Sequence, residues 1–166
     1  MPTHLWERDV LGDEGKSMIR VLAACAALLL LPACVSAPKS YSFKKSWSIG
    51  TDFDSAWTAT VQLFAENNWP VATLEKDSGI IASEWVTIPH KNDACDCGSA
   101  GLLVTVHRTE AKFNVFLRNT DDGCSLTVNA SYRQLRQFEA QTWWQECSST
   151  GELEGRVKEE ILLRAE

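Results

Sequence analysis

YSFKKSWSIGTDFDSAWTATVQLFAENN, residues 41–68, decides how the fold begins. Apolar and polar side chains alternate loosely from Tyr41 to Ile49, which predicts a strand with one buried face. Gly50-Thr51-Asp52 then offers a turn and a helix N-cap. Up to Asn67, the next residues recur at helical spacing along one face, at Phe53, Ala56, Trp57, Thr60, Val61 and Phe64. The segment therefore predicts a strand followed directly by an amphipathic helix over 53–67.

The residues that follow predict antiparallel strands joined by short turns. Alternation and turn chemistry place these strands at Trp69–Leu74, Ile80–Ile88, Leu102–His107, Lys112–Arg118 and Ser125–Leu135. Residues 76–79 and 119–123 are typical hairpin turns. The pattern leaves two alternatives for the middle of this region. Leu102–His107 and Lys112–Arg118 either form a hairpin that turns at Thr109-Glu110 or make one long bent strand.

The C-terminal part predicts a second helix. Ser149-Thr150-Gly151-Glu152 matches a capping box, and an apolar stripe follows at Leu153, Val157, Ile161 and Leu162. Gln137–Cys147 shows no clear pattern, and we expect an irregular or helical linker there. The expected fold class is α+β, a curved antiparallel sheet of five or six strands with two helices packed on one face.

An export signal precedes this folded part. Met18-Ile19-Arg20 is a short basic start, and the apolar run Val21–Leu31 is too short to span a bilayer, which takes about 20 residues. Leu31-Pro32-Ala33-Cys34 resembles the lipobox of bacterial lipoproteins, whose cysteine is acylated and becomes the first residue of the mature protein. The alternative is an ordinary secretory signal that is cut after Ala33 or Ala37.

These features divide the chain. Residues 1–17 carry more acidic than basic side chains, unlike the start of an export signal, so we expect translation to begin at Met18. Residues 18–33 are then the signal peptide, 34–40 a lipidated tether, and 41–166 a single α+β domain. By the sorting rule of such lipoproteins, valine rather than aspartate at position 35 predicts the periplasmic face of the outer membrane.

Composition restricts the partners. The chain has 22 Asp and Glu against 16 Lys and Arg, a formal net charge of −6. An acidic domain does not favour nucleic acid or anionic lipid surfaces. We therefore expect attachment to the bilayer through the acyl chains on Cys34, each buried methylene of which contributes about 0.8 kcal/mol.

Four cysteines of the expected domain indicate two disulfides, because exported thiols are normally oxidised. They are Cys95, Cys97, Cys124 and Cys147. Pairing Cys95 with Cys97 would close a strained small ring. We favour Cys97–Cys147 together with Cys95–Cys124, and the exchanged pairing is the alternative.

His90, Cys95 and Cys97 together could begin a soft-metal site. Their C-x-C spacing and the oxidising compartment favour disulfides instead, so we expect neither a metal nor another cofactor. C-x-C rather than C-x-x-C also argues against a thiol oxidoreductase, and the chain contains no G-x-S-x-G motif. We expect no catalytic residues and no enzymatic activity.

Tryptophan is abundant, with seven in the chain. Trp57 and Trp85 are expected in the core because they lie on the apolar faces of their elements. Trp143-Trp144 falls in the unassigned linker. The pair is either a contact surface, since aromatic side chains are common interface anchors, or it packs under the linker beside Cys147.

Several short motifs together resemble a known family. They are WSI at 47–49, DSAW at 54–57, NWPV at 68–71, DSGII at 77–81 and SEW at 83–85. Over residues 44–88 they resemble the helix-grip domains of outer-membrane lipoproteins, such as the lipoprotein subunit of the β-barrel assembly machine. The resemblance implies a helix-grip fold and a role in outer-membrane assembly or maintenance. CDCG at 95–98 and CSSTGELE at 147–154 look instead like small proteobacterial lipoproteins.

The sequence thus favours a non-catalytic, membrane-anchored periplasmic module that binds a component of the cell envelope. The expected partners are the bilayer, through Cys34, and an unidentified envelope protein, with no nucleic acid. An exposed sheet edge or Trp143-Trp144 would form the contact surface. The alternative is a small-ligand binder that uses the cleft between the long helix and the sheet.

Overall fold

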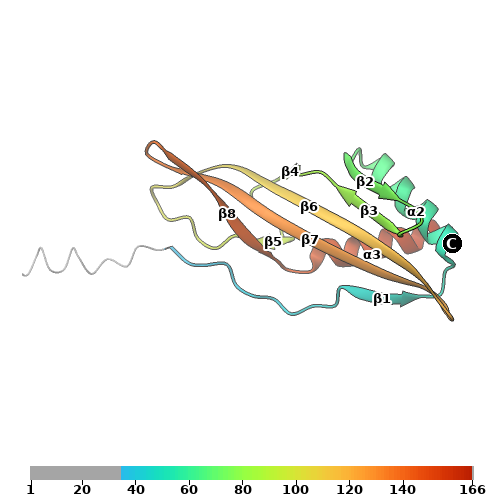
Figure 1. The fold of residues 1–166 in the computed structure, drawn as a ribbon. Coiled ribbons are helices and arrows are strands. Elements are labelled where there is room, and N and C mark those ends of the chain that lie inside the picture. Colours follow the sequence, from blue (N-terminus) through green and yellow to red (C-terminus); the bar gives the residue numbers. More distant parts are fainter. Residues whose placement is uncertain (1–34, 166) are drawn as a thin grey trace, which may run out of the picture. The chain divides into compact units, whose positions relative to one another are not determined.

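A hairpin of two long strands runs through the whole sheet (Figure 1). The computed structural model describes residues 35–165. Within this range, β6 (Thr105–Thr120) and β7 (Gly123–Phe138) have 16 residues each and pair along their length. Gly123 follows the two-residue turn between them as the first residue of β7, and its φ of +125° is a conformation that side-chain-bearing residues rarely adopt. The two segments expected at 102–107 and 112–118 are therefore one strand, the second of the two alternatives.

Short strands extend this hairpin on both sides. β3 (Ile80–Ser83) and β4 (Val86–Ile88) pair successively with β6, whereas β1 (Ser46–Ile49) and β8 (Gln141–Ser149) pair successively with β7. The outermost strands are β2 (Val71–Glu75) on β3 and β5 (Cys95–Asp96) on β8. All of these pairs are antiparallel, and the main path of the sheet is β2-β3-β6-β7-β8-β5.

The fold class α+β is confirmed, but the expected five or six strands are wrong, because the sheet formed by the described residues has eight. The strand expected over Ile80–Ile88 divides into β3 and β4, and the loop expected between Pro89 and Gly101 contains β5. The linker expected at Gln137–Cys147 is mostly β8. A two-residue turn with Glu139 at φ +51° joins β8 to β7. Most of β8 is exposed on both faces, so its sequence lacks the alternation that marks a half-buried strand.

The first helix forms as expected. α2 spans Phe53–Glu66, and the Asp52 carboxylate accepts a 3.0 Å hydrogen bond from the backbone N–H of Ser55, so Asp52 is the N-cap. At the other end Asn68 takes a φ of +51°, and Trp69 N–H bonds back to the Phe64 carbonyl. This closure ends the helix and directs the chain into β2.

The second helix, α3 (Glu152–Ala165), begins differently from the expected capping box. Gly151, at φ +92°, lies where a Cβ would meet the Phe43 ring at 2.5 Å. A capping box would have the Ser149 hydroxyl accept from Glu152 N–H. It accepts instead from Gly151 N–H, and it donates to the Glu154 carboxylate. The helix position was therefore predicted correctly, and the partner of Ser149 was not.

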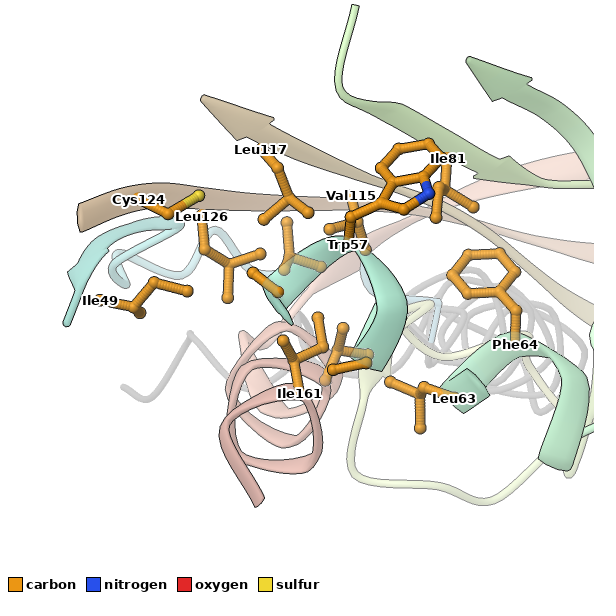
Figure 2. Close-up of a cluster of buried hydrophobic side chains, with 14 of the residues drawn as sticks. Ile49, Trp57, Leu63, Phe64, Ile81, Val115, Leu117, Cys124, Leu126 and Ile161 are labelled. Atoms are coloured by element: carbon orange, nitrogen blue, oxygen red, sulfur yellow. The ribbon is translucent and has the colours of Figure 1, made fainter. Parts of the chain in front are cut away.

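Both helices pack on the same face of the sheet and share one core (Figure 2). Trp57, Leu63 and Phe64 of α2 meet Val157 and Ile161 of α3 and the inward side chains of the sheet. The sheet contributes mainly Ile49, Ile81, Phe113, Val115, Leu117, Cys124, Leu126 and Val128. This core lies toward the β6–β7 turn, and the β7–β8 turn lies at the other end of the strands (Figure 1).

Among residues 35–165, neither helix has the length and apolar character needed to cross a bilayer. The expected signal peptide and Cys34 lie outside the described residues.

Candidate functional site

A disulfide joins the loop that follows β4 to β8, the last strand in the chain order. It links Cys97 to Cys147, as the sequence predicted. Next to it, β5 pairs with the end of β8, with Cys95 opposite Ser149 and Asp96 opposite Ser148. The bond and this short ladder together hold the loop against the C-terminal end of β8.

The second predicted disulfide, Cys95–Cys124, is wrong: both of these cysteines are free. Cys124 lies in the helix-covered core and pairs with Ile49. Cys147 lies opposite Tyr132 on β7. Tyr132 is eight positions after Cys124, so these two positions on the strand are roughly 26 Å apart at the usual rise. A disulfide requires Cα atoms within about 7 Å. The same separation rules out the exchanged pairing, which also needed Cys124.

Cys95 completes a cluster of three sulfur atoms. Its Sγ lies 3.9 Å from the Sγ of Cys97. The Sγ atoms of Cys95, Cys97 and Cys147 all lie within 4.8 Å of one another. The Cys95 thiol donates a weak hydrogen bond to Asn92 Oδ1 at 3.6 Å, and burial raises its pKa. A free thiol therefore lies directly beside the disulfide.

His90, the other candidate ligand in the sequence, lies near this cluster but outside it. It lines the same open hollow of about 370 Å³ as Cys95 and Cys97. Its Nδ1 is 3.1 Å from the Thr109 hydroxyl oxygen. The structure thus brings Cys147, rather than His90, together with the two neighbouring cysteines.

Behind the sulfurs lies a buried hydroxyl without a hydrogen bond. Tyr132 is 1% exposed, and Cys95 and Cys147 pack against the small cluster that it forms with Ala94 and Ala111. Within the described part of the chain its Oη makes no hydrogen bond of normal geometry, although the Ser149 hydroxyl is close enough to oppose the rise in the pKa of Tyr132. Burial and then the nearby Glu154 carboxylate raise the pKa of Tyr132 far above its usual value. Glu154 itself is fully buried, and both its oxygens accept from the Ser149 hydroxyl.

A buried guanidinium lies beside the same loop. Arg136 on β7 is 4% exposed. It donates to the carbonyl oxygens of Cys97 and Gly98 at 2.6 and 3.3 Å, and to Gln134 Oε1 at 2.8 Å. All three acceptors are neutral, and burial lowers the pKa of Arg136.

Sequence reasoning missed Tyr132 and Arg136 as members of this site. A signal was present, because Leu126, Val128, Ala130 and Tyr132 alternate on the buried face of β7. The same period leads directly to Gln134 and Arg136. Two polar residues at buried-face positions indicate that something polar covers that end of the strand.

The chain segment after Cys34 lies along the cysteine loop. Ser99 N–H donates to the Ser36 carbonyl at 3.1 Å. The Asp96 carboxylate accepts from Lys39 N–H at 3.2 Å and from the Tyr41 hydroxyl at 3.0 Å. Backbone N–H donors, Gly98 first and then Lys39, lower the pKa of Asp96. The expected tether is therefore fixed to the domain over its described residues, 35–40.

The loop also presents apolar side chains to solvent. Leu102 is 99% exposed and Leu103 is 77% exposed, a few residues before β6 begins. Val35 is 60% exposed and borders Gly101. The start of the described chain and the most exposed leucines thus belong to one small region.

The two tryptophans singled out in the sequence lie on opposite faces of β8. Trp144 stacks on the Arg133 guanidinium at 4.0 Å, and Arg133 also stacks on Trp85 at the same distance. The Glu110 carboxylate pairs with Arg133 at 2.7 Å and holds it in place. Trp143 lies next to Arg136 in the strand pairing. Trp85, which we expected in the core, belongs to this surface stack instead.

β8 has an open edge. On one side it pairs with β7 along residues 141–147. On the other side, β5 covers only Ser148 and Ser149. Within the described residues, the backbone of Gln141–Glu146 therefore has a strand neighbour on one side only.

The cleft expected between the long helix and the sheet is filled by side chains. Trp57 and Phe64 are buried there, and Phe64 contacts Phe113 with ring centroids 5.1 Å apart. A hollow of about 200 Å³ remains between α2 and α3, where Arg156 and Arg164 are among the lining residues.

Comparison with known proteins adds no relative to these observations. No protein-family model matches the sequence, and no curated protein matches it either.

Proposed function

We propose that the chain is a non-catalytic lipoprotein of the bacterial cell envelope, anchored to the outer membrane through acylated Cys34. Facing the periplasm, it binds an envelope protein through the open edge of β8. The observation that carries the proposal is the fixed position of residues 36–41 along the cysteine loop. The resemblance over residues 44–88 directs this function toward outer-membrane assembly or maintenance.

The fixed segment supports an anchor that holds the domain at the membrane surface. Val35, which directly follows the proposed acylation site in the sequence, borders the loop that carries Leu102 and Leu103. Exposed leucines of this kind gain free energy on leaving water, up to about 3 kcal/mol for a fully buried side chain. The loop would then insert beside the acyl chains and limit the orientations of the domain.

The edge of β8 supports the binding role. Soluble proteins usually protect exposed edge strands with lysine, proline, bulges or short length. β8 is nine residues long, contains neither lysine nor proline, and carries Trp143 and Trp144 on its two faces. An extended segment of a partner protein can pair with such an edge through backbone hydrogen bonds, while the tryptophans contact its side chains.

The filled core disfavours the small-ligand alternative. Drug-sized ligands usually occupy pockets of about 300–1,000 Å³, whereas the hollow between the helices measures about 200 Å³. Trp57 and Phe64 take the space that a ligand would need between α2 and the sheet.

Membrane fractionation with metabolic palmitate labelling tests the anchor. The parent chain should label and sediment with outer membranes, and Cys34→Ser should lose both properties. Cys25→Ser is the matched control, because it removes a cysteine that precedes the proposed cleavage site. If Cys34→Ser labels and sediments as the parent does, the anchor proposal is wrong.

Site-specific photocrosslinking in intact cells tests the binding edge. A photoreactive side chain at Thr142 or Gln145 should give one discrete crosslinked product. The same group at Lys112, an exposed position on β6, should not give that product. Equal crosslinking from all three positions would contradict a specific edge.

A further inference from the structure

We propose that Cys95, Cys97 and Cys147 form a zinc site when the Cys97–Cys147 disulfide is reduced. The three thiolates would occupy three positions of the tetrahedron that zinc prefers. The fourth position would face the hollow that His90 lines. The site goes beyond the anchoring and edge-binding roles and does not depend on them.

The spacing of the sulfur atoms carries the first part of the argument. Zinc–thiolate bonds of about 2.3 Å at tetrahedral angles place sulfur atoms roughly 3.8 Å apart. Cys95 Sγ and Cys97 Sγ are already 3.9 Å apart. The third sulfur lies within 4.8 Å of both, so side-chain rotation after the disulfide opens is sufficient.

The charge of Arg136 carries the second part. Buried charges in proteins are normally paired with an opposite charge. Yet the hydrogen bonds of Arg136 among the described residues go to neutral acceptors, two of which are the carbonyls of Cys97 and Gly98. Zinc with three thiolates carries one net negative charge, and it would lie beside this guanidinium.

The unpaired hydroxyl of Tyr132 carries the third part. A buried donor without an acceptor is rare in native proteins and calls for an explanation such as a missing ion. Cys95 and Cys147 pack against the small buried cluster that Tyr132 forms with Ala94 and Ala111, and Cys147 lies opposite Tyr132 in the strand pairing. A zinc-bound thiolate is a hydrogen-bond acceptor, so occupation of the site would satisfy the Tyr132 hydroxyl. Groups that bond to metal ligands in this way commonly improve metal affinity 10–100-fold.

The chemistry balances with a dithiol as the reductant. Two electrons and two protons pass to the Cys97–Cys147 bond, which opens to two thiols, and the dithiol becomes a disulfide. Zinc binding then displaces one proton from each of the three cysteine thiols. In the reverse direction a disulfide is the oxidant: thiol–disulfide exchange transfers two electrons from Cys97 and Cys147 to it, the Cys97–Cys147 bond forms, and the oxidant leaves as two thiols. This removes two of the three ligands and releases the metal.

Zinc retention by the parent chain, purified from whichever cell fraction holds it, is the main test. The protein is compared in its oxidised form and after anaerobic reduction with a dithiol, followed by incubation with zinc and gel filtration. The reduced form should retain one zinc per chain and the oxidised form none. Equal retention by both forms, or none by the reduced form, would overturn the proposal.

Single substitutions locate the ligands. Cys95→Ser should lower the zinc affinity of the reduced chain at least tenfold, in a competition with a chromophoric chelator. Cys124→Ser is the matched control, because Cys124 is free and lies in the other part of the hairpin. Equal losses in both variants would show that the cluster is not the site. Cobalt bound to the parent chain gives an independent readout, since tetrahedral thiolate coordination has a distinctive visible spectrum.

Tyr132→Phe separates metal binding from folding. The substitution removes a hydroxyl that has no partner in the metal-free protein, so the stability of that form should be unchanged or higher. Zinc affinity should nevertheless fall about 10–100-fold. Unchanged affinity would contradict the role assigned to the hydroxyl.

Discussion

Arg136 Nη2 lies 2.6 Å from the carbonyl oxygen of Cys97, so a buried guanidinium on β7 fixes the loop that the disulfide also holds. The contact joins the longest strand pair of the sheet to the segment that contacts residues 36–41. The position of the proposed anchor and that of the cysteine cluster therefore depend on the same loop.

Replacement of this guanidinium should destabilise the domain. In Arg136→Met, the carbonyls of Cys97 and Gly98 lose their charged donor, and we expect the free energy of unfolding to fall by about 1.5–3 kcal/mol. Urea denaturation measures the change. Arg118→Met is the control, because Arg118 is exposed on β6 and should change stability by about 0.5 kcal/mol or less. Equal effects would contradict the role of Arg136.

A cavity in the shared core should cost more than the same truncation on the surface. Ile161 of α3 is fully buried between the helices and the sheet. Ile161→Ala should lower the free energy of unfolding by about 2–5 kcal/mol. Leu163→Ala is a matched control on the same helix, since Leu163 is 68% exposed. Similar losses from both variants would mean that α3 is not packed as described.

The N-cap of α2 should make stability depend on pH. The backbone N–H of Ser55 is the main group that lowers the pKa of Asp52. Because the folded-state pKa lies below the unfolded one, the contribution is complete above the ordinary carboxyl pKa. It is lost as pH falls through the folded-state value. The deficit of Asp52→Ala relative to the parent should therefore be largest near neutral pH and shrink below about pH 4.

Urea midpoints at pH 7 and pH 3 measure this dependence. Asp52→Asn keeps an acceptor for Ser55 but does not titrate. Its urea midpoint should stay close to that of the parent at pH 7, and it should lack the pH dependence that the ionisation of Asp52 causes. A deficit of Asp52→Ala that is the same at both pH values would show that ionised Asp52 is not the effective cap.

The exposed leucines should contribute to membrane contact without affecting folding. In the unlipidated Cys34→Ser chain, we expect Leu102→Ser together with Leu103→Ser to reduce co-sedimentation with neutral phosphatidylcholine vesicles at least tenfold. The reason is the lost burial of two side chains worth about 1.5–3 kcal/mol each. Leu163→Ser, an exposed leucine on α3, is the control. Unchanged vesicle binding in the double variant would contradict insertion of this loop.

Much of the first half of the fold could be predicted from local patterns. α2 is recognisable because its apolar face recurs at helical spacing and Asp52 stands directly before it. β8 is not recognisable in this way. Only Gln145, Cys147 and the two serines after it are partly covered, so no alternation reveals the strand. Its pairing with β7 depends on the turn at Glu139, whose left-handed backbone is unusual for glutamate.

The cysteine pairing shows the same limit. Of the two disulfides predicted from the sequence, Cys97–Cys147 is confirmed, whereas Cys95–Cys124 is wrong because the strand register keeps these two cysteines apart. Register places Cys147 opposite Tyr132 and Cys124 opposite Asn119. No local sequence pattern predicts this register, and it is the register that separates Cys124 from the other three cysteines.

The most direct measurement is the mass of the N-terminal peptide of the protein extracted from cell membranes. We predict that this peptide begins at Cys34 and carries the mass of acyl chains, with no peptide recovered from residues 1–33. An N-terminal peptide that begins elsewhere, or that contains Cys34 without added lipid, would contradict a lipid-anchored protein.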